Sequence, residues 1–227
     1  MDCKELLEEG LRTDPQFSNE SIENLVMIGE FIGKNPIFFK KLYKAYRNSE
    51  KQVEYKAKIG APVCIIFDRS ADEVKINRAS VEIELTMTSF LRFLEFIDTC
   101  FLEIVPLGSV VDIDLDFASE KIRKMMKEGN QGTLVMISAQ KVSLEREMSQ
   151  FVIDYIGRFW PFGEAGAVPP IYLSNAMIKN IVHKGLTNEF EQEVTSRLRK
   201  EIIQHQKRSL LFLSKGEADK IMKEGYE

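Results

Sequence analysis

The spacing of apolar residues changes near Pro62, and this change constrains the fold more than any other feature of the sequence. Before it, apolar residues recur at the spacing of an amphipathic helix: Ile22, Leu25, Val26, Ile28 and Ile32. After it, the stretch "VKINRASVEIEL" alternates apolar and polar residues, as half-buried strands do. The chain is therefore expected to be an α+β protein whose helices come first.

Two main helices are expected in the first 60 residues. Ser18 is the expected N-cap of the first, and the pair Asn35–Pro36 marks the start of the second. The second helix is expected to continue to Gly60, since glycine commonly ends helices. It would carry four cations near one face: Lys40, Lys44, Arg47 and Lys51. We expect this face to be solvated, with an electrostatic contact to an acidic partner as the alternative.

A hairpin and a buried helix are expected next. The stretch "PVCIIF" predicts a short strand, and "VKINRASVEIEL" predicts two strands that turn near residues 77–80. The inward candidates of this hairpin are Val74, Ile76, Val81, Ile83 and Leu85. Thr88 or Ser89 is the expected cap of the helix "FLRFLEFIDTCFL". Its apolar residues surround most of the helix, as in a helix that is buried between layers.

The second half of the chain is expected to be richer in strands. Strands are predicted in "EIVPLGSVVDIDL", "TLVMISAQKV" and "SQFVIDYIGRF", with a short helix in "ASEKIRKMMKEGNQG". The stretch "IYLSNAMIKNIVHKGL" predicts a short strand, a helical turn and a last strand around Ile181 to His183. A final helix is expected from Asn188. The sequence thus predicts a helical N-terminal region, a central and mostly antiparallel sheet, and C-terminal helices. Three parts are expected: a helical region with a hairpin at residues 1–102, a β-rich domain at residues 103–186, and a helical segment at residues 187–227 that packs on the rest.

Composition argues against several classes of function. The net charge of -4 disfavours nucleic-acid binding, which needs a cationic surface. No run of about 18 apolar residues appears, so membrane insertion is not expected. The start "MDCKELLEEGLRTD" lacks the pattern of a secretory signal, which predicts a cytoplasmic protein. Cys3, Cys64 and Cys100 are far apart and never form a CxxC pair, so we expect reduced thiols.

Motifs for chemistry are incomplete in this sequence. Asp112, Asp114 and Asp116 follow the spacing of the first half of a calcium loop, but Phe117 and Arg123 stand where glycine and glutamate are needed. On a strand, the three carboxylates would share one face as an exposed acidic stripe. His183 and His205 are 22 residues apart, which is not the spacing of a zinc site. We therefore expect no metal, no cofactor and no enzymatic activity.

Three segments of the chain carry a family resemblance. Together, "PLGSVV", "DYIGRFWPFG" and "YLSNAMIKNIVHKGL" resemble a small family of uncharacterised domains from Gram-positive bacteria. The resemblance covers about residues 103–186. The family's compact hairpin after the first strand is replaced here by the acidic strand and helix between Asp112 and Gly132. Members of that family tend to be encoded beside toxins of the type VII secretion system, the toxins that have an N-terminal Leu-x-Gly domain.

This resemblance implies a function in protein binding. The expected role is a non-enzymatic cytoplasmic accessory protein, a chaperone or targeting factor, whose partner is a type VII secreted toxin from the same operon. One alternative is an immunity protein that inhibits the toxin domain, where the acidic residues at 112, 114 and 116 would cover a basic site. A second alternative is a hydrolase or nuclease whose site is assembled from scattered carboxylates.

The stretch "DYIGRFWPFG" supplies the main candidate for a binding site. Gly157, Pro161 and Gly163 allow a turn after a strand. The aromatic residues of this stretch either cap the core or form an exposed patch, and tryptophan is a common interface anchor. The candidate partner-binding residues are Phe159, Trp160, Phe162, Asp112, Asp114, Asp116, Lys40, Lys44, Arg47 and Lys51.

Overall fold

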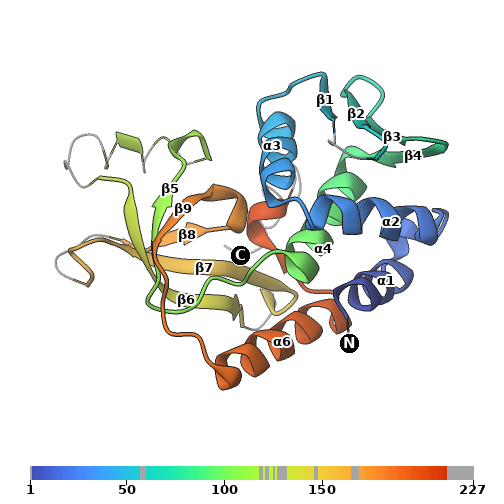
Figure 1. The fold of residues 1–227 in the computed structure, drawn as a ribbon. Coiled ribbons are helices and arrows are strands. Elements are labelled where there is room, and N and C mark those ends of the chain that lie inside the picture. The colour runs from blue at the N-terminus through green and yellow to red at the C-terminus, as the bar shows by residue number, and fades with distance from the viewer. Residues whose placement is uncertain are drawn as a thin grey trace. The chain divides into compact units, whose positions relative to one another are not determined.

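The computed structural model describes residues 2–213, except for 57–59, 118–119, 121–122, 125, 127–131, 146–147 and 165–168. The fold is α+β, as predicted, with N-terminal helices, antiparallel strands and a C-terminal helix (Figure 1). The strands form two separate antiparallel sheets, one of four strands and one of six. The chain forms two compact units. Unit 1 contains residues up to Leu102 together with Arg199–Arg208 and the chain from Phe212, and unit 2 contains Glu103–Leu198 and Ser209–Leu211.

Unit 1 begins with four helical elements: α1 (Cys3–Thr13), the 3-10 helix η1 (Pro15–Phe17), α2 (Ile22–Gly33) and α3 (Pro36–Arg47). The start of α3 at Pro36 is as predicted. The predicted cap of α2 was wrong, because its N-cap is Ser21 and Ser18 ends η1. Ser18 has helical backbone angles, φ -59° and ψ -27°, whereas an N-cap residue needs an extended backbone.

The prediction that the second helix continues to Gly60 was also wrong. Helix α3 ends at Arg47, and Ser49 has a φ of 60°, a left-handed conformation that stops a helix. The chain then forms strand β1 (Gln52–Tyr55), whose Val53 is buried. The Tyr55 ring packs against Phe38 with centroids 4.7 Å apart. Pairing with a neighbouring strand and this ring contact therefore override the local helical pattern.

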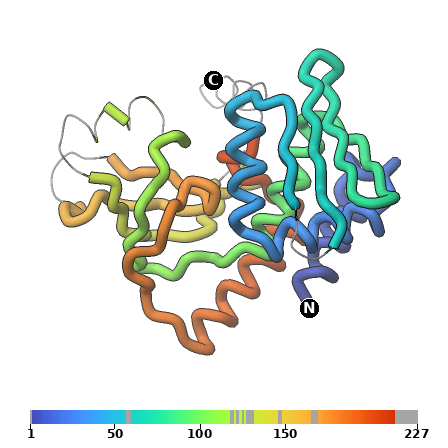
Figure 2. The backbone as a smooth tube through the Cα atoms, turned by 45° about the horizontal axis from the view of Figure 1, so that its top comes forward, coloured from blue at the N-terminus to red at the C-terminus, as the bar shows by residue number. Residues whose placement is uncertain are grey.

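The sheet of unit 1 has the strand order β1-β2-β3-β4, where β2 is Val63–Asp68, β3 is Glu73–Arg78 and β4 is Val81–Thr86. These strands run side by side from cyan to green in Figure 2. The predicted hairpin is confirmed, with Arg78 paired to Val81 and a turn at Ala79 and Ser80. Four of the five inward candidates are buried and Val81 is half-buried.

Helix α4 (Met87–Phe101) is buried on almost every side, as the distribution of its apolar residues predicted. Its N-cap is Thr86, whose hydroxyl accepts a hydrogen bond from the Ser89 amide, rather than Thr88 or Ser89. Glycines on α1 and α2 allow close packing, since a Cβ on Gly29 would lie 2.6 Å from Leu7 and 3.2 Å from Phe93. The helix therefore forms the centre of unit 1.

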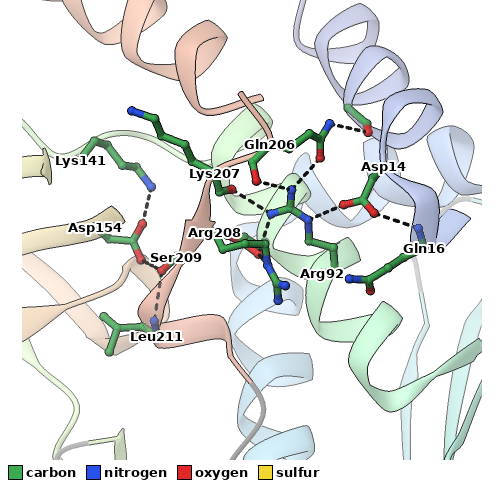
Figure 3. A network of polar contacts seen from close by, with 12 residues as sticks. Asp14, Gln16, Arg92, Lys141, Asp154, Gln206, Lys207, Arg208, Ser209 and Leu211 are labelled. Atoms are coloured by element: carbon green, nitrogen blue, oxygen red, sulfur yellow. Dashed lines mark hydrogen bonds and ion pairs between the residues drawn. The ribbon is translucent and has the colours of Figure 1, made fainter. Parts of the chain in front are cut away.

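A buried arginine connects α4 to other parts of unit 1. The Arg92 guanidinium is 2.8 Å from Asp14 Oδ2 and 2.9 Å from Glu95 Oε2, and it stacks on the Phe96 ring. It also donates to the carbonyl oxygen of Lys207 and to the side chain of Gln206 (Figure 3). Because an unpaired buried charge is costly, this network fixes residues 206–207 against α4.

Unit 2 contains the second sheet, of order β10-β7-β6-β5-β9, and β8 also pairs with β7. Its strands are β5 (Val110–Ile113), β6 (Leu134–Ser143), β7 (Phe151–Phe159), β8 (Ile171–Leu173), β9 (Ile178–His183) and β10 (Arg208–Ser209). The strands predicted in this region are confirmed, including the last strand, which begins three residues earlier than expected. The helix predicted at residues 118–132 lies largely outside the described residues.

Short helical elements join these strands: η2 (Leu115–Phe117), η4 (Asn175–Met177) and η5 (Leu210–Phe212). The helical turn predicted after β8 is η4. The final helix is α6 (Glu189–Gln204), and the Asn188 side chain accepts a hydrogen bond from the Glu191 amide at its start. The predicted position of this helix is confirmed.

The core of unit 2 lies on one face of its sheet. That face contributes Val135 and Ile137 from β6, Tyr155 and Phe159 from β7, and residues of the neighbouring strands. Residues outside the strands cover it: Ile104, Val105, Leu115, Phe117, Met126, Met177 and Leu211. Because side chains alternate along a strand, the residues between these core positions point to the opposite face.

Candidate protein-binding face

The aromatic turn after β7 contains one buried ring and two exposed rings. Phe159 is 1% exposed and belongs to the core, whereas Trp160 and Phe162 are 48% and 44% exposed. The Trp160–Pro161 peptide bond is cis. Gly163 has a φ of 59° and donates its amide to the Phe159 carbonyl oxygen at 3.0 Å, so the turn closes directly on the end of the strand. Both alternatives from the sequence are thus realised, each by different rings of the turn.

Trp160 continues the face of the sheet that points away from the core. Its amide donates to the Leu134 carbonyl oxygen at 2.9 Å, which places the Trp160 backbone beside the start of β6. Ile156 is paired with Tyr172, and Tyr172 is 49% exposed. By strand alternation, five apolar or aromatic side chains that are half-buried or exposed share this side of the sheet, and we name them the outer face: Leu134, Met136, Ile156, Trp160 and Tyr172.

The outer face stands on a closely packed scaffold. A Cβ on Gly157 would overlap the Val135 side chain, so only glycine lets β6 and β7 approach at this point. Arg158, which is paired with Met136, forms an ion pair of 2.5 Å with Glu164. This pair connects the turn back to the strand that precedes it. Tyr172 lies on strand β8, and Trp160 is the first residue after strand β7.

A buried polar network holds the family motifs together behind this face. The Tyr155 hydroxyl accepts a hydrogen bond from the Val105 amide at 3.0 Å and lies 2.9 Å from Asn175 Oδ1. Tyr155 comes from "DYIG" and Asn175 from "YLSN". The Gly185 amide donates to Ser109 Oγ at 2.9 Å, which connects "PLGS" to "HKGL". The three motifs are thus adjacent in space, and their hydrogen-bonded residues have structural roles: Ser109, Tyr155, Asn175 and Gly185.

The acidic candidates do not form a single stripe. Strand β5 ends at Ile113, so only Asp112 lies on a strand, and the prediction of one strand face was wrong. Asp112 is on the same side of the sheet as Leu134, its partner on β6, and it accepts a hydrogen bond from Thr133. Asp114 instead accepts from the Asp116 amide at 3.0 Å, a local turn that bends the chain into η2.

The structure therefore brings Asp112 and Trp160 to one face. Each lies beside Leu134, Asp112 through strand pairing and Trp160 through its backbone hydrogen bond. Lys179 is 3.9 Å from Asp112 Oδ2. Sequence reasoning missed Leu134, Met136, Ile156 and Tyr172, whose place on this face depends on the strand register. Only the alternation of β6 and β7 gave a signal for them.

The basic candidates belong to unit 1. Lys40 and Lys44 are half-buried on α3, and Arg47 is exposed at its end. Lys51 lies beyond the helix, where its carbonyl oxygen accepts a hydrogen bond from the Phe67 amide at 2.8 Å. The predicted face of four cations at helical spacing was therefore wrong for Lys51, because α3 ends four residues before it.

No three His, Cys, Asp or Glu side chains in the described residues gather closely enough to hold a metal ion. None of the helices in the same parts of the chain has the length and apolar character needed to cross a bilayer.

The position of the motifs in unit 2 agrees with a family model. Residues 104–194 match the model of the DUF4176 family. DUF4176 is a domain of unknown function, so the resemblance to an uncharacterised family is confirmed, and its link to type VII secretion stays a prediction. Neither the curated proteins nor the solved structures give a significant match to the chain. The outer face, including Trp160 and Tyr172, lies within the residues that match DUF4176.

Proposed function

We propose that the protein is a non-enzymatic accessory protein that binds another protein through the outer face of its DUF4176 domain. The observation that carries the proposal is the pair of half-exposed rings, Trp160 and Tyr172, on the same side of an antiparallel sheet as half-buried aliphatic residues. Rigid aromatic side chains are frequent anchors of interfaces, because they bury a large area and lose little conformational entropy on binding.

The proposed partner is a type VII secreted toxin, and the proposed role is that of a chaperone or targeting factor that acts in the cytoplasm before export. The family resemblance motivates this partner. A non-enzymatic role is proposed because the exposed groups of the outer face are mainly apolar. An immunity role would use the same kind of contact but a different part of the toxin.

The test is co-expression of the whole chain with the toxin encoded beside it, in two forms: the toxin's N-terminal segment alone and its toxic domain alone. Capture of the N-terminal segment supports the chaperone role, and capture of the toxic domain alone replaces it by the immunity role. Trp160→Ala and Tyr172→Ala should each weaken the captured complex by about 2 kcal/mol, as at interface hot spots.

A matched control is available in unit 1. Ile37 is 86% exposed on α3, so Ile37→Ala removes a comparably accessible apolar side chain away from the outer face. It should leave binding unchanged. If Ile37→Ala weakened the complex as much as Trp160→Ala while both variants stayed folded, the outer face would not be the binding site.

A further inference from the structure

Strand β9 is an open edge of the sheet in unit 2. It pairs with β5 on one side (Figure 1), and among the described residues no strand pairs with its other side. All five residues after Ile178 are exposed. An open edge presents backbone N–H and C=O groups to which another extended chain can pair. This edge is distinct from the outer face, since it would bind through its backbone.

The charges of β9 disfavour pairing with a second copy of itself. Lys179 lies within the strand and is 63% exposed in its side chain, and Lys184 follows the strand and is 51% exposed. Antiparallel pairing of two copies would bring the lysines of both chains to one seam, and like charges across a sheet are destabilising. An acidic strand would instead meet complementary charge.

Both lysines already have a carboxylate neighbour in this chain, but each can accept a second. Lys184 is 2.5 Å from Glu103, which raises the pKa of Lys184 through hydrogen bonding and charge, and Lys179 is 3.9 Å from Asp112. Exposed ion pairs of this kind contribute little, and an ammonium group has three donors. A partner carboxylate can therefore be added without breaking a strong contact.

Exposed apolar residues occur on β9 and in the residues that follow it in the chain. Ile181 and Val182 are 37% and 60% exposed on β9, and Leu186 and Phe190 follow at 80% and 70%. Register shifts in the β5–β9 pair leave Val182 opposite no residue of β5, so its side chain is not part of a regular cross-strand row. The exposed Val182 side chain is therefore available for a partner's apolar residue.

We infer that the β9 edge binds an extended acidic segment of a partner protein by strand addition. Backbone hydrogen bonds along residues 179–183 would hold the segment, and pockets between alternate side chains would select it. Lys179 and Lys184 would contact its carboxylates. Val182 would contact an apolar residue of the segment. The inference does not depend on the proposed outer-face function.

The test begins with a phage-displayed library of random 12-residue peptides, selected on the whole chain. Selected peptides should be acidic with alternating apolar residues, and a synthetic copy should bind in a fluorescence anisotropy titration. N-methylation of one set of alternate peptide amides should weaken binding at least tenfold, because it removes the donors of the ladder. N-methylation of the other set should have little effect.

Matched variants locate the site. Lys179→Glu combined with Lys184→Glu should weaken the affinity for the peptide at least tenfold. Lys34→Glu combined with Lys56→Glu makes the same charge change in unit 1 and should change that affinity less than twofold. Trp160→Ala should also leave the affinity unchanged, which separates this site from the outer face. Three outcomes would overturn the inference: the selected peptides are not acidic, neither N-methylated set loses binding, or the two lysine pairs have equal effects. So would a dimer in sedimentation that Val182→Asp dissociates, since a second copy would then occupy the edge.

Discussion

The ammonium group of Lys141 lies 2.6 Å from Asp154 Oδ1, and both side chains are only 1% exposed. Asp154 also accepts a hydrogen bond of 2.6 Å from the Ser209 hydroxyl, and the oxygen of that hydroxyl accepts a hydrogen bond from the Leu211 amide (Figure 3). The pair thus joins β6 and β7 and holds the segment at β10 within unit 2. Lys141 adopts a φ of 47° to reach this position.

The first prediction follows from this ion pair. Asp154→Ala leaves the Lys141 charge buried without its carboxylate, so the free energy of unfolding should fall by about 3–5 kcal/mol. Urea unfolding measures it. The double variant Lys141→Met with Asp154→Leu should recover most of the loss, because an apolar pair removes both desolvation penalties. A loss below about 1 kcal/mol for Asp154→Ala would contradict a buried pair.

The second prediction concerns the hydroxyl that joins the family motifs. Tyr155→Phe leaves the Val105 amide without its acceptor, which should cost about 1–3 kcal/mol of stability. Tyr172→Phe removes the same atom from an exposed ring and should change stability by less than about 0.5 kcal/mol. Thermal unfolding of the two variants side by side makes the comparison. Equal effects would show that the Tyr155 hydroxyl has no structural role.

The third prediction separates the two rings that follow one another in the aromatic turn. Phe159→Ala opens a cavity in the core of unit 2 and should cost about 3–5 kcal/mol. Trp160→Ala removes a half-exposed ring and should cost about 1 kcal/mol or less. Chemical denaturation gives both values. The reverse order would mean that Trp160, rather than Phe159, closes the core.

The fourth prediction concerns Asp68, at the end of β2. Hydrogen bonds from the Ser70 hydroxyl, at 2.5 Å, and from the Ala71 amide, at 3.1 Å, lower the pKa of Asp68 below its usual value. A lowered pKa in the folded state stabilises the protein above the usual carboxyl pKa of about 3.9, and this contribution is lost as the pH falls through the folded value.

An NMR titration of the Asp68 carboxyl should therefore have its midpoint below the usual value. In Ser70→Ala the midpoint should move upward, because the largest contribution to the lowered pKa is gone. Ser80→Ala, in the turn between β3 and β4, is a control that should leave it in place. A midpoint that Ser70→Ala does not move would assign the lowered pKa to the backbone amides alone.

The sequence alone determined the kinds of element and most of their order. The alternation in "VKINRASVEIEL" predicted the hairpin β3–β4, since only a strand puts Val74, Ile76, Ile83 and Leu85 on one side. The all-round apolar pattern of residues 90–102 likewise predicted the burial of α4. These predictions succeeded because hydrophobic periodicity is a local property that the fold preserves.

Boundaries were predicted less well where a distant contact decided them. Nothing near Ser49 indicates that β1 will follow, because the residues of β1 pair with residues of β2 that lie 8 to 14 positions later in the chain. The expected acidic stripe failed for a related reason. The Asp114 side chain caps a turn, and the Asp114 amide donates a hydrogen bond to the Met177 carbonyl oxygen. The residues near Asp114 in the sequence give no indication of that partner.

The candidate sites show the same division. The sequence by itself identified Trp160 and Phe162 as possible anchors and Asp112 as a possible contact, from residue type alone. Only the tertiary structure decided that Phe159 is core, that Asp112 and Trp160 share a face through Leu134, and that β9 is an open edge. The physical reason is strand register: it sets which side chains point to which face and which strand lies last, and it arises from pairing between segments that are far apart in the chain.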